Sequence, residues 1–178
     1  MNRVIRLIEK DNIRVKALEN VASLDLPECY IAAGFIRNLV WDSLHNKQIP
    51  TSLNDVDVIY YDANESNETA HLEYESRLSA LMPELNWQVR NQAKMHLRNG
   101  DEPYLNSVDS MSYWPEKETA VAIRQLDNQG YECVSAFGFD SLFNLKLSHN
   151  PKRTKAIFEH RVKSKQWLEH WPQLVIVS

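Results

Sequence analysis

The sequence of 178 residues has little glycine and cysteine, no long apolar run and no excess of positive charge. With four glycines and no Gly/Ser-rich tract, it contains no segment typical of a flexible linker. Its two cysteines, Cys29 and Cys133, lack the CxxC or Cys/His spacing of a zinc site. These absences argue against a disulfide scaffold and a structural zinc domain, and they favour a single domain over residues 1–178.

The charge balance and the hydropathy pattern restrict the class further. Lys and Arg total 20 while Asp and Glu total 24, so the net charge is -4 and no global basic field attracts nucleic acid. No apolar stretch approaches the length of a membrane-spanning helix, and the charged first 22 residues lack the apolar centre of a signal peptide. We therefore expect a cytoplasmic protein with no membrane partner.

Helical and strand-like patterns alternate irregularly along the chain. Apolar spacing predicts two helices within 3–22 and further helices at 35–45, 64–82, 107–113, 141–147 and 152–171, with another beginning at Pro115. Alternating β-branched residues predict strands at 29–34, 55–61 and from residue 87, where a turn follows, and a hairpin of 121–126 with 131–135. Because there is no regular βαβα order, these patterns predict an α+β fold.

Asp55 and Asp57, at the start of the strand 55–61, are the strongest candidates for chemistry. Residues i and i+2 of a strand face the same side, so the two carboxylates lie a few ångströms apart. Like charges this close repel, and each carboxylate resists ionisation unless a cation lies between them. Mg²⁺ prefers such oxygen ligands and is commonly held by one or two carboxylates together with substrate phosphates. The pair therefore predicts a site for Mg²⁺ or Mn²⁺.

A glycine turn upstream supplies a candidate phosphate site. Gly34 follows a buried strand and precedes a helix, where free backbone N–H groups could meet a phosphate. Arg37, one turn into that helix, could add a charged fork to the same phosphate or could pair with an acidic neighbour on the surface. Asn54 could orient Asp55 by hydrogen bonding, or it could simply end the preceding loop.

The hexapeptide AGFIRN at residues 33–38, followed by DVD at 55–57, resembles the nucleotidyltransferase signature of the DNA polymerase β superfamily. It is most similar to the head pattern G-G-x-V-R-D … D-x-D of bacterial tRNA nucleotidyltransferases and poly(A) polymerases. Over roughly residues 30–171 the chain also resembles a bacterial family of nucleotidyltransferase-like proteins. The stretches that carry this second likeness are 34–62, 87–96, 114–121 and 137–143.

The resemblance implies a nucleotidyltransferase-like mixed β-sheet flanked by helices, with its core at about 25–148 and helical N- and C-terminal flanks. It also implies metal-dependent transfer of a nucleoside monophosphate (NMP) from a nucleoside triphosphate (NTP) to an acceptor hydroxyl, with release of pyrophosphate. Asp55 and Asp57 would then be the catalytic metal ligands, and Gly34, Arg37 and Asn54 would contact the nucleotide.

The chain departs from the family pattern at several positions. Ala33 stands in place of the first glycine, and Asn38 stands where the tRNA enzymes have Asp. Active members use a third carboxylate on a later strand, whereas the next strand-like run here offers the neutral Asn91, with Asp109 as the alternative. A second hypothesis is therefore a catalytically degenerate nucleotide-binding or interaction domain that kept the fold.

The acceptor is not identified by these motifs. Given the net charge of -4 and the absence of a tRNA-binding extension in this sequence, a small molecule or a protein is favoured over RNA. The basic residues at 90–98 are either a polyanion channel or a solvated face, and those at 152–155 are interpreted as solvated. The tryptophans at 87, 114, 167 and 171 are interpreted as packing residues.

Overall fold

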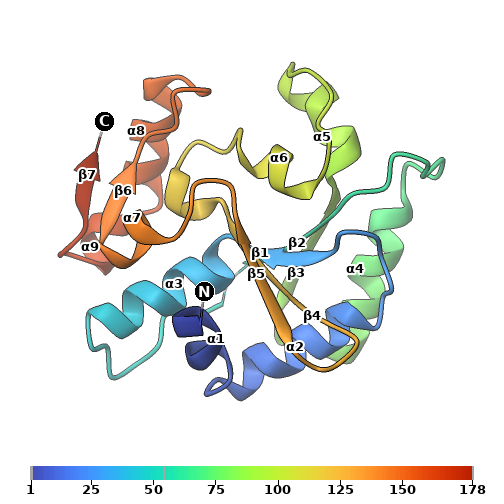
Figure 1. The fold of residues 1–178 in the computed structure, drawn as a ribbon, viewed down its shortest axis with the longest axis horizontal. Helices are drawn as coiled ribbons and strands as arrows, with labels where there is room; N and C mark the ends of the chain where they lie inside the picture. Colours follow the sequence, from blue (N-terminus) through green and yellow to red (C-terminus); the bar gives the residue numbers. More distant parts are fainter. Residues whose placement is uncertain (1, 54, 178) are drawn as a thin grey trace.

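A mixed five-stranded sheet forms the centre of the molecule (Figure 1), with strand order β3-β2-β1-β4-β5. The computed structural model describes residues 2–53 and 55–177. The strands are β1 (Tyr30–Ala32), β2 (Asp55–Tyr60), β3 (Asn86–Asn91), β4 (Val121–Gln125), β5 (Tyr131–Ser135), β6 (Lys146–Ser148) and β7 (Val175–Val177). The helices are α1 (Asn2–Ile8), α2 (Asn12–Ala22), α3 (Gly34–Leu44), α4 (Ala70–Leu81), α5 (Gln92–Asn99), α6 (Ser107–Met111), α7 (Asp140–Phe143), α8 (Lys155–Ser164), α9 (Trp167–His170) and the 3₁₀ helix η1 (Lys117–Thr119).

The strand pairing makes the sheet mixed. β2 runs parallel to β3 and antiparallel to β1, and β1 is antiparallel to β4. β4 and β5 form the predicted hairpin, with Gln125 opposite Tyr131 next to the turn. The α+β class and the mixed sheet flanked by helices are therefore confirmed.

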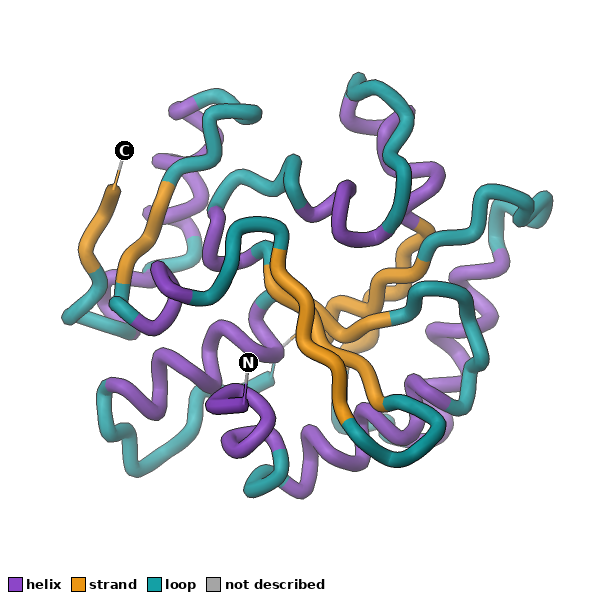
Figure 2. Tube along the Cα trace, in the orientation of Figure 1, coloured by secondary structure: helices purple, strands orange, loops and turns teal. Residues whose placement is uncertain are grey.

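The two faces of the sheet are covered differently. Val56, Val58 and Tyr60 of β2 belong to the main hydrophobic core, and α2 and α4 lie on one side of the sheet while α5 and α6 lie on the other (Figure 2). Ile59 joins a smaller apolar cluster that includes Met111 of α6. Because neighbouring residues of a strand point to opposite faces, Asp55 and Asp57 lie on the side of Ile59, away from the main core.

The C-terminal segment adds a second layer beside α3. β6 and β7 pair in parallel as a separate two-stranded sheet, and α7 contacts both α3 and β6. The main apolar cluster extends from Val4 in α1 to Leu174 just before β7. Both flanks thus contribute residues to the same apolar cluster, and one domain with its core at about 25–148 stays a prediction. No helix of the described chain has the length and apolar character needed to cross a membrane.

Two predicted helices are shorter than expected because local backbone contacts compete with them. The helix predicted at 64–82 begins only at Ala70, since Asp62 and Asn67 accept hydrogen bonds from the backbone N–H groups two residues ahead and hold the chain in turns. The helix predicted at 141–147 ends at Phe143. Leu145 has a φ of 53°, which is outside the helical region, and the chain then enters β6.

Three further predictions need correction. The turn expected after β3 is the helix α5, which Asn91 caps through a 3.1 Å hydrogen bond from the Ala93 N–H to its side chain. The helix expected to begin at Pro115 is reduced to η1. The long C-terminal helix is broken at Gln166, whose φ of 50° is left-handed, so α8 and α9 point in different directions.

Candidate active site

A cleft of about 620 Å³ opens where the start of α3, the strands β2 and β3, and the helices α8 and α9 meet. Gly34, Arg37, Asp55 and Asp57 all line it. Its volume falls in the range of sites that hold small molecules. Four of the five predicted site residues therefore share one cavity, and the fifth, Asn54, lies outside the described residues.

The two aspartates differ in their surroundings. Asp55 is exposed and accepts a 2.5 Å hydrogen bond from Nδ2 of Asn86 on β3. Asp57 is half-buried between Ala32 of β1 and Gln88 of β3. Burial raises the pKa of Asp57, Arg37 opposes this shift, and the neighbouring charge of Asp55 adds to it. A bound cation would relieve both the desolvation and the repulsion.

The donor set at this pair fits one hard cation. No cluster of three or more His, Cys, Asp or Glu side chains suited to a metal ion occurs among residues 2–53 and 55–177. A cation at Asp55 and Asp57 would therefore complete its coordination with water or phosphate oxygens. That pattern suits Mg²⁺, which keeps several waters and is usually bound by one or two carboxylates plus substrate phosphates.

Arg37 is a buried cation held by neutral groups. Its Nη1 donates to Oγ1 of Thr119 at 2.6 Å, and its Nε and Nη2 donate to Oδ1 of Asn38 at 3.2 and 3.0 Å. Its guanidinium lies 4.7 Å from the ring centroid of Trp167 and 5.3 Å from that of Trp41. Burial lowers the pKa of Arg37 to about 10, with Glu116 opposing this shift, so the group stays charged at neutral pH.

The surroundings of Arg37 bear on one of its two predicted roles, the surface ion pair. Within the described chain it forms no ion pair with an Asp or Glu side chain, so the surface pair is not observed. A buried charge without a counter-ion is costly. The charges of Glu116, Asp57 and Glu118 act on Arg37 without direct contact and raise its pKa, and contact of Arg37 with a phosphate stays a prediction.

The turn into α3 carries backbone strain at Ala33 rather than at Gly34. Ala33 has φ 56° and ψ -121°, a region that favours glycine. An added Cβ at Gly34 would lie 3.3 Å from Nδ2 of Asn38 and 3.6 Å from Nη2 of Arg37. The small residue at position 34 thus leaves room for the Arg37 guanidinium and its acceptor, while Ala33 occupies the strained position that a glycine has in the family pattern.

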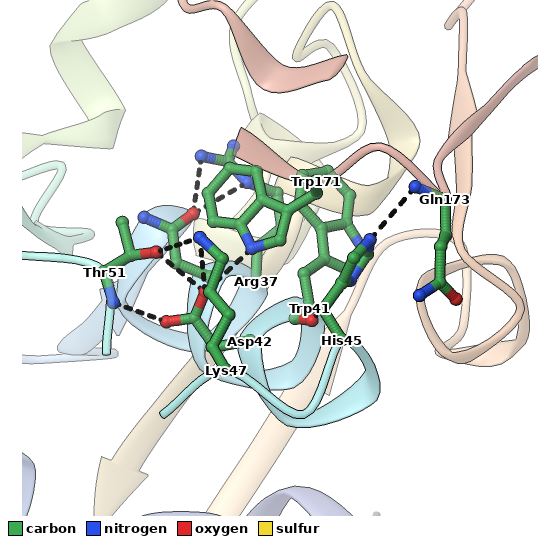
Figure 3. A network of polar contacts seen from close by, with 9 residues as sticks. Arg37, Trp41, Asp42, His45, Lys47, Thr51, Trp171 and Gln173 are labelled. Atoms are coloured by element: carbon green, nitrogen blue, oxygen red, sulfur yellow. Dashed lines mark hydrogen bonds and ion pairs between the residues drawn. The ribbon is translucent and has the colours of Figure 1, made fainter. Parts of the chain in front are cut away.

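Asp42 of α3 connects this helix by hydrogen bonds to Thr51, in the loop before β2, and to Trp171 in the C-terminal segment (Figure 3). Its buried carboxylate accepts hydrogen bonds from the N–H and the hydroxyl of Thr51, at 2.6 and 2.7 Å, and from Nε1 of Trp171 at 2.8 Å. Thr51 and Trp171 both line the cleft. One buried acid therefore positions two separate parts of the cleft wall.

The residues proposed for the third polar position do not line the cleft. Asn91 is buried, and its amide donates to the backbone oxygen of Asp62 and to Oε2 of Glu65, both at 2.8 Å. Asp109 accepts from the backbone N–H of Leu105 at 2.9 Å. The β3 residue in register with Asp57 is Gln88, a neutral amide.

Several lining residues were not identified from the sequence. Arg161 and Lys165, near the C-terminal end of the chain, bring positive charge into the cleft. Arg90 of β3 also lines it and belongs to the basic residues at 90–98, for which a polyanion channel was one of the two interpretations. Lys165 follows Arg161 by four residues, a spacing that places both on one helical face and could have suggested a shared role. Their distance in sequence from Asp57 left no local signal that they approach it.

The mixed sheet carries two aspartates on β2, and the helix that follows the neighbouring strand β1 carries a buried arginine. This arrangement is that of a nucleotidyltransferase-type fold. The chain belongs to the nucleotidyltransferase family, whose profile matches residues 19–176. No curated protein matches the sequence.

Solved structures support this assignment. A solution structure described as revealing a CCA-adding enzyme head domain is similar with a TM-score of 0.86 and 25% identity, over 99% of this chain and 95% of that one. A CCA-adding enzyme in complex with CTP matches with a TM-score of 0.62 and 12% identity, over 98% of this chain and 43% of that one. A tRNA-processing enzyme complex matches with a TM-score of 0.51 and 16% identity, over 91% of this chain and 43% of that one. The last two show the shared fold alone.

Proposed function

We propose that this protein transfers an NMP from an NTP to an acceptor hydroxyl, with release of pyrophosphate. The observation that supports this most is the placement of Asp55, Asp57 and the unpaired Arg37 in one cleft. Four cationic and two anionic side chains line that cleft, although the whole chain has a net charge of -4. Two of these cations, Arg90 and Arg161, are paired with Glu75 and Glu116, so Arg37 and Lys165 are the lining Lys and Arg residues outside those ion pairs.

Asp55 and Asp57 would hold Mg²⁺ or Mn²⁺ at the reacting phosphate. A bound ion of this kind neutralises phosphate charge and makes a coordinated hydroxyl more acidic. The rigid strand β2 fixes the separation of the two carboxylates, because Val56 and Val58 between and beside them are fully buried. The main core therefore orients the pair.

Arg37 and the first turn of α3 would bind the phosphates. The guanidinium, fixed by Thr119 and Asn38, neutralises charge that develops as the acceptor oxygen bonds to the α-phosphorus and the bond to pyrophosphate breaks. Gly34, at the N-terminus of this eleven-residue helix, lines the same cleft and offers backbone N–H groups. The predicted contribution of Asn54 is to orient Asp55.

The acceptor is proposed to be a small molecule or a protein, since the net charge of -4 provides no broad field for RNA. CTP is one donor to include among the four NTPs, because it is bound by a CCA-adding enzyme of the same fold.

The test is a transfer assay. Wild type is incubated with Mg²⁺, each α-labelled NTP and three acceptor pools (small metabolites, proteins and RNA), and both pyrophosphate release and label transfer are measured. Asp57→Asn and Asp55→Asn are compared with Asp62→Asn, a control just beyond the end of β2 that does not line the cleft. Turnover by Asp57→Asn equal to wild type would exclude this site as the catalytic centre.

The alternative is a domain that binds a nucleotide without transferring it. Gln88, rather than a carboxylate, stands beside Asp57 on β3, and this neutral residue weakens any second cation site. The alternative predicts Mg²⁺-dependent binding of an NTP with no pyrophosphate release in any acceptor pool. The same assay, combined with a binding measurement, separates the two functions.

A further inference from the structure

We propose that Arg161 and Lys165 form a second anion-binding arm that takes the pyrophosphate portion of the NTP, and that Glu116 positions this arm. The inference rests on the proposed function, because it assigns residues to the leaving group of that reaction. It concerns a part of the chain outside the motif that contains Asp55, Asp57 and Arg37.

Arg161 and Lys165 reach the cleft from a part of the chain that is distant in sequence from the motif. Both line it, Arg161 from α8 and Lys165 from the residue that ends this helix. Lys163, on another side of α8, lines a separate groove. The helix therefore directs two of its basic side chains to the cleft and at least one away from it.

Glu116 fixes the Arg161 guanidinium while leaving part of it available. The Glu116 side chain is fully buried, and it accepts from Nε of Arg161 at 2.6 Å and from Nη2 at 3.3 Å. The Nη1 group of Arg161 makes no hydrogen bond to the described residues. A guanidinium held by one edge in this way is oriented before a ligand arrives and can still donate to it.

One indole ring brings the two arginines close together. The centroid of Trp167 lies 4.7 Å from the guanidinium carbon of Arg37 and 5.8 Å from that of Arg161. The charge of Arg161 lowers the pKa of Arg37, as expected of neighbouring like charges. Glu116 is the ion-pair partner of Arg161, whereas neither Arg37 nor Lys165 forms an ion pair among the described residues, so both can donate to an anion in the cleft.

The size of this cationic surface favours a chain of phosphates over a single one. Arg37 lies at the start of α3, whereas Arg161 and Lys165 extend the positive surface to the wall formed by α8 and α9. Inorganic phosphate offers one phosphate group to these three cations, whereas a triphosphate offers three. A linear triphosphate can place one phosphate at Asp57 and Arg37 and the remaining two at Arg161 and Lys165.

Binding of simple phosphates tests this arm without knowledge of the base. Tripolyphosphate and inorganic phosphate are titrated with Mg²⁺ into wild type, Lys165→Ala and Arg161→Lys, by calorimetry or by the fluorescence of the cleft tryptophans. Arg161→Lys keeps a cation beside the buried Glu116 but removes the additional N–H donors of the guanidinium. Lys165 is exposed. Both variants should therefore fold. Lys163→Ala is the matched control on the same helix.

We expect the affinity for tripolyphosphate to fall roughly 10-fold or more in each arm variant, because a charge-assisted hydrogen bond is lost. Affinity for inorganic phosphate should change less than about 2-fold, and Lys163→Ala should match wild type. Wild-type affinity for tripolyphosphate in both arm variants, or an equal loss in Lys163→Ala, would overturn the inference. If those variants bind normally while Asp57→Asn abolishes transfer, the arm is wrong and the proposed function stands; transfer by Asp57→Asn would instead contradict the proposed function.

Discussion

The two walls of the cleft hold their arginines in opposite ways. On the wall formed by α3, Arg37 is buried and all of its side-chain hydrogen bonds go to neutral oxygens of Thr119 and Asn38. On the wall formed by α8, Arg161 is about a third exposed and is paired with the fully buried Glu116. The first arginine forms no ion pair among the described residues, although nearby acidic groups act on its charge, and the second belongs to an ion pair that also maintains the structure.

Because of this difference, we expect Arg37 to matter mainly for ligand binding and Arg161 to matter also for the stability of the fold. A buried cation with no counter-ion costs folding free energy and gains it back when an anion binds. An ion pair with one fully buried partner behaves differently, because removal of the cation leaves a carboxylate uncompensated in the interior. The same kind of side chain should therefore give different mutational results on the two walls.

The largest expected effect is on the motif wall. Asp57→Asn should reduce NMP transfer by on the order of 10³-fold or more, since charge stabilisation at the reacting phosphate depends on this carboxylate. The assay is pyrophosphate release at saturating NTP and Mg²⁺. Far-UV circular dichroism should be unchanged, because the side chain is replaced by one of the same shape.

The second prediction compares the two arginines directly. Arg161→Met should lower the free energy of unfolding by about 2–4 kcal/mol, because Glu116 is left buried without its partner. Arg37→Met should change it by no more than about 1 kcal/mol, since relief of the buried charge offsets the lost hydrogen bonds. Urea denaturation followed by tryptophan fluorescence measures both variants.

A rescue variant sharpens this comparison. Arg161→Met combined with Glu116→Gln should recover most of the lost stability, because the uncompensated carboxylate is removed. Equal destabilisation by Arg37→Met and Arg161→Met would contradict the distinction between the two walls.

The third prediction concerns pH. The pKa of Asp57 is raised, mainly by burial, so ionisation of this group opposes folding. The contribution of neutral Asp57 to the free energy of unfolding is fully present below the ordinary pKa of 3.8. It is lost as the pH rises through the raised pKa of Asp57 in the folded protein. Without metal, Asp57→Asn should therefore be more stable than wild type at pH 7, and the gap should close towards pH 3 in urea denaturation.

Asp101 serves as a control because its pKa is shifted in the opposite direction to that of Asp57. Hydrogen bonds from Arg153 lower its pKa, so its stabilising effect is present above the ordinary value of 3.8 and disappears as the pH falls through the lowered one. Asp101→Asn should be less stable than wild type at pH 7 and should approach it at low pH. If both variants shift stability in the same direction at pH 7, the contrast between these two carboxylates is wrong.

The smallest expected effect is on the backbone at Ala33. Ala33→Gly should raise the free energy of unfolding by up to about 1 kcal/mol, because glycine adopts φ 56° and ψ -121° without strain. Its greater freedom in the unfolded chain limits the gain. Ala33→Val should destabilise the protein, and a thermal melt in which valine is tolerated as well as glycine would contradict the strain.

Local sequence patterns predicted the motif wall because its residues lie close together in the chain. The strand periodicity of β2 put Asp55 and Asp57 on one face, and Gly34 and Arg37 follow β1 within one helical turn. The hairpin of β4 and β5 was also correct, as was the mixed sheet that the family resemblance implied. Helix limits were less accurate where side chains capped turns, as at Asp62 and Asn67.

The second wall could not be predicted for a physical reason. Arg161 contacts Glu116 across 45 residues and reaches the cleft only because α8 and α9 dock beside α3. The basic residues at 152–155 were interpreted as solvated, yet Arg153 is largely buried in an ion pair with Asp101. Such contacts depend on tertiary packing, which has no local periodicity.

Thermal melting with Mg²⁺ and each NTP shows whether a nucleotide binds at Asp55 and Asp57, when wild type is compared with Asp55→Asn/Asp57→Asn. At a hundredfold excess over its dissociation constant, a ligand of the folded state adds about 2.7 kcal/mol of stability, or roughly 5–10 °C for a chain of this size. We predict such a shift for wild type with at least one NTP, dependent on Mg²⁺ and absent from the double variant. No shift with any NTP, or an equal shift in the double variant, would contradict a nucleotide site at the Asp pair.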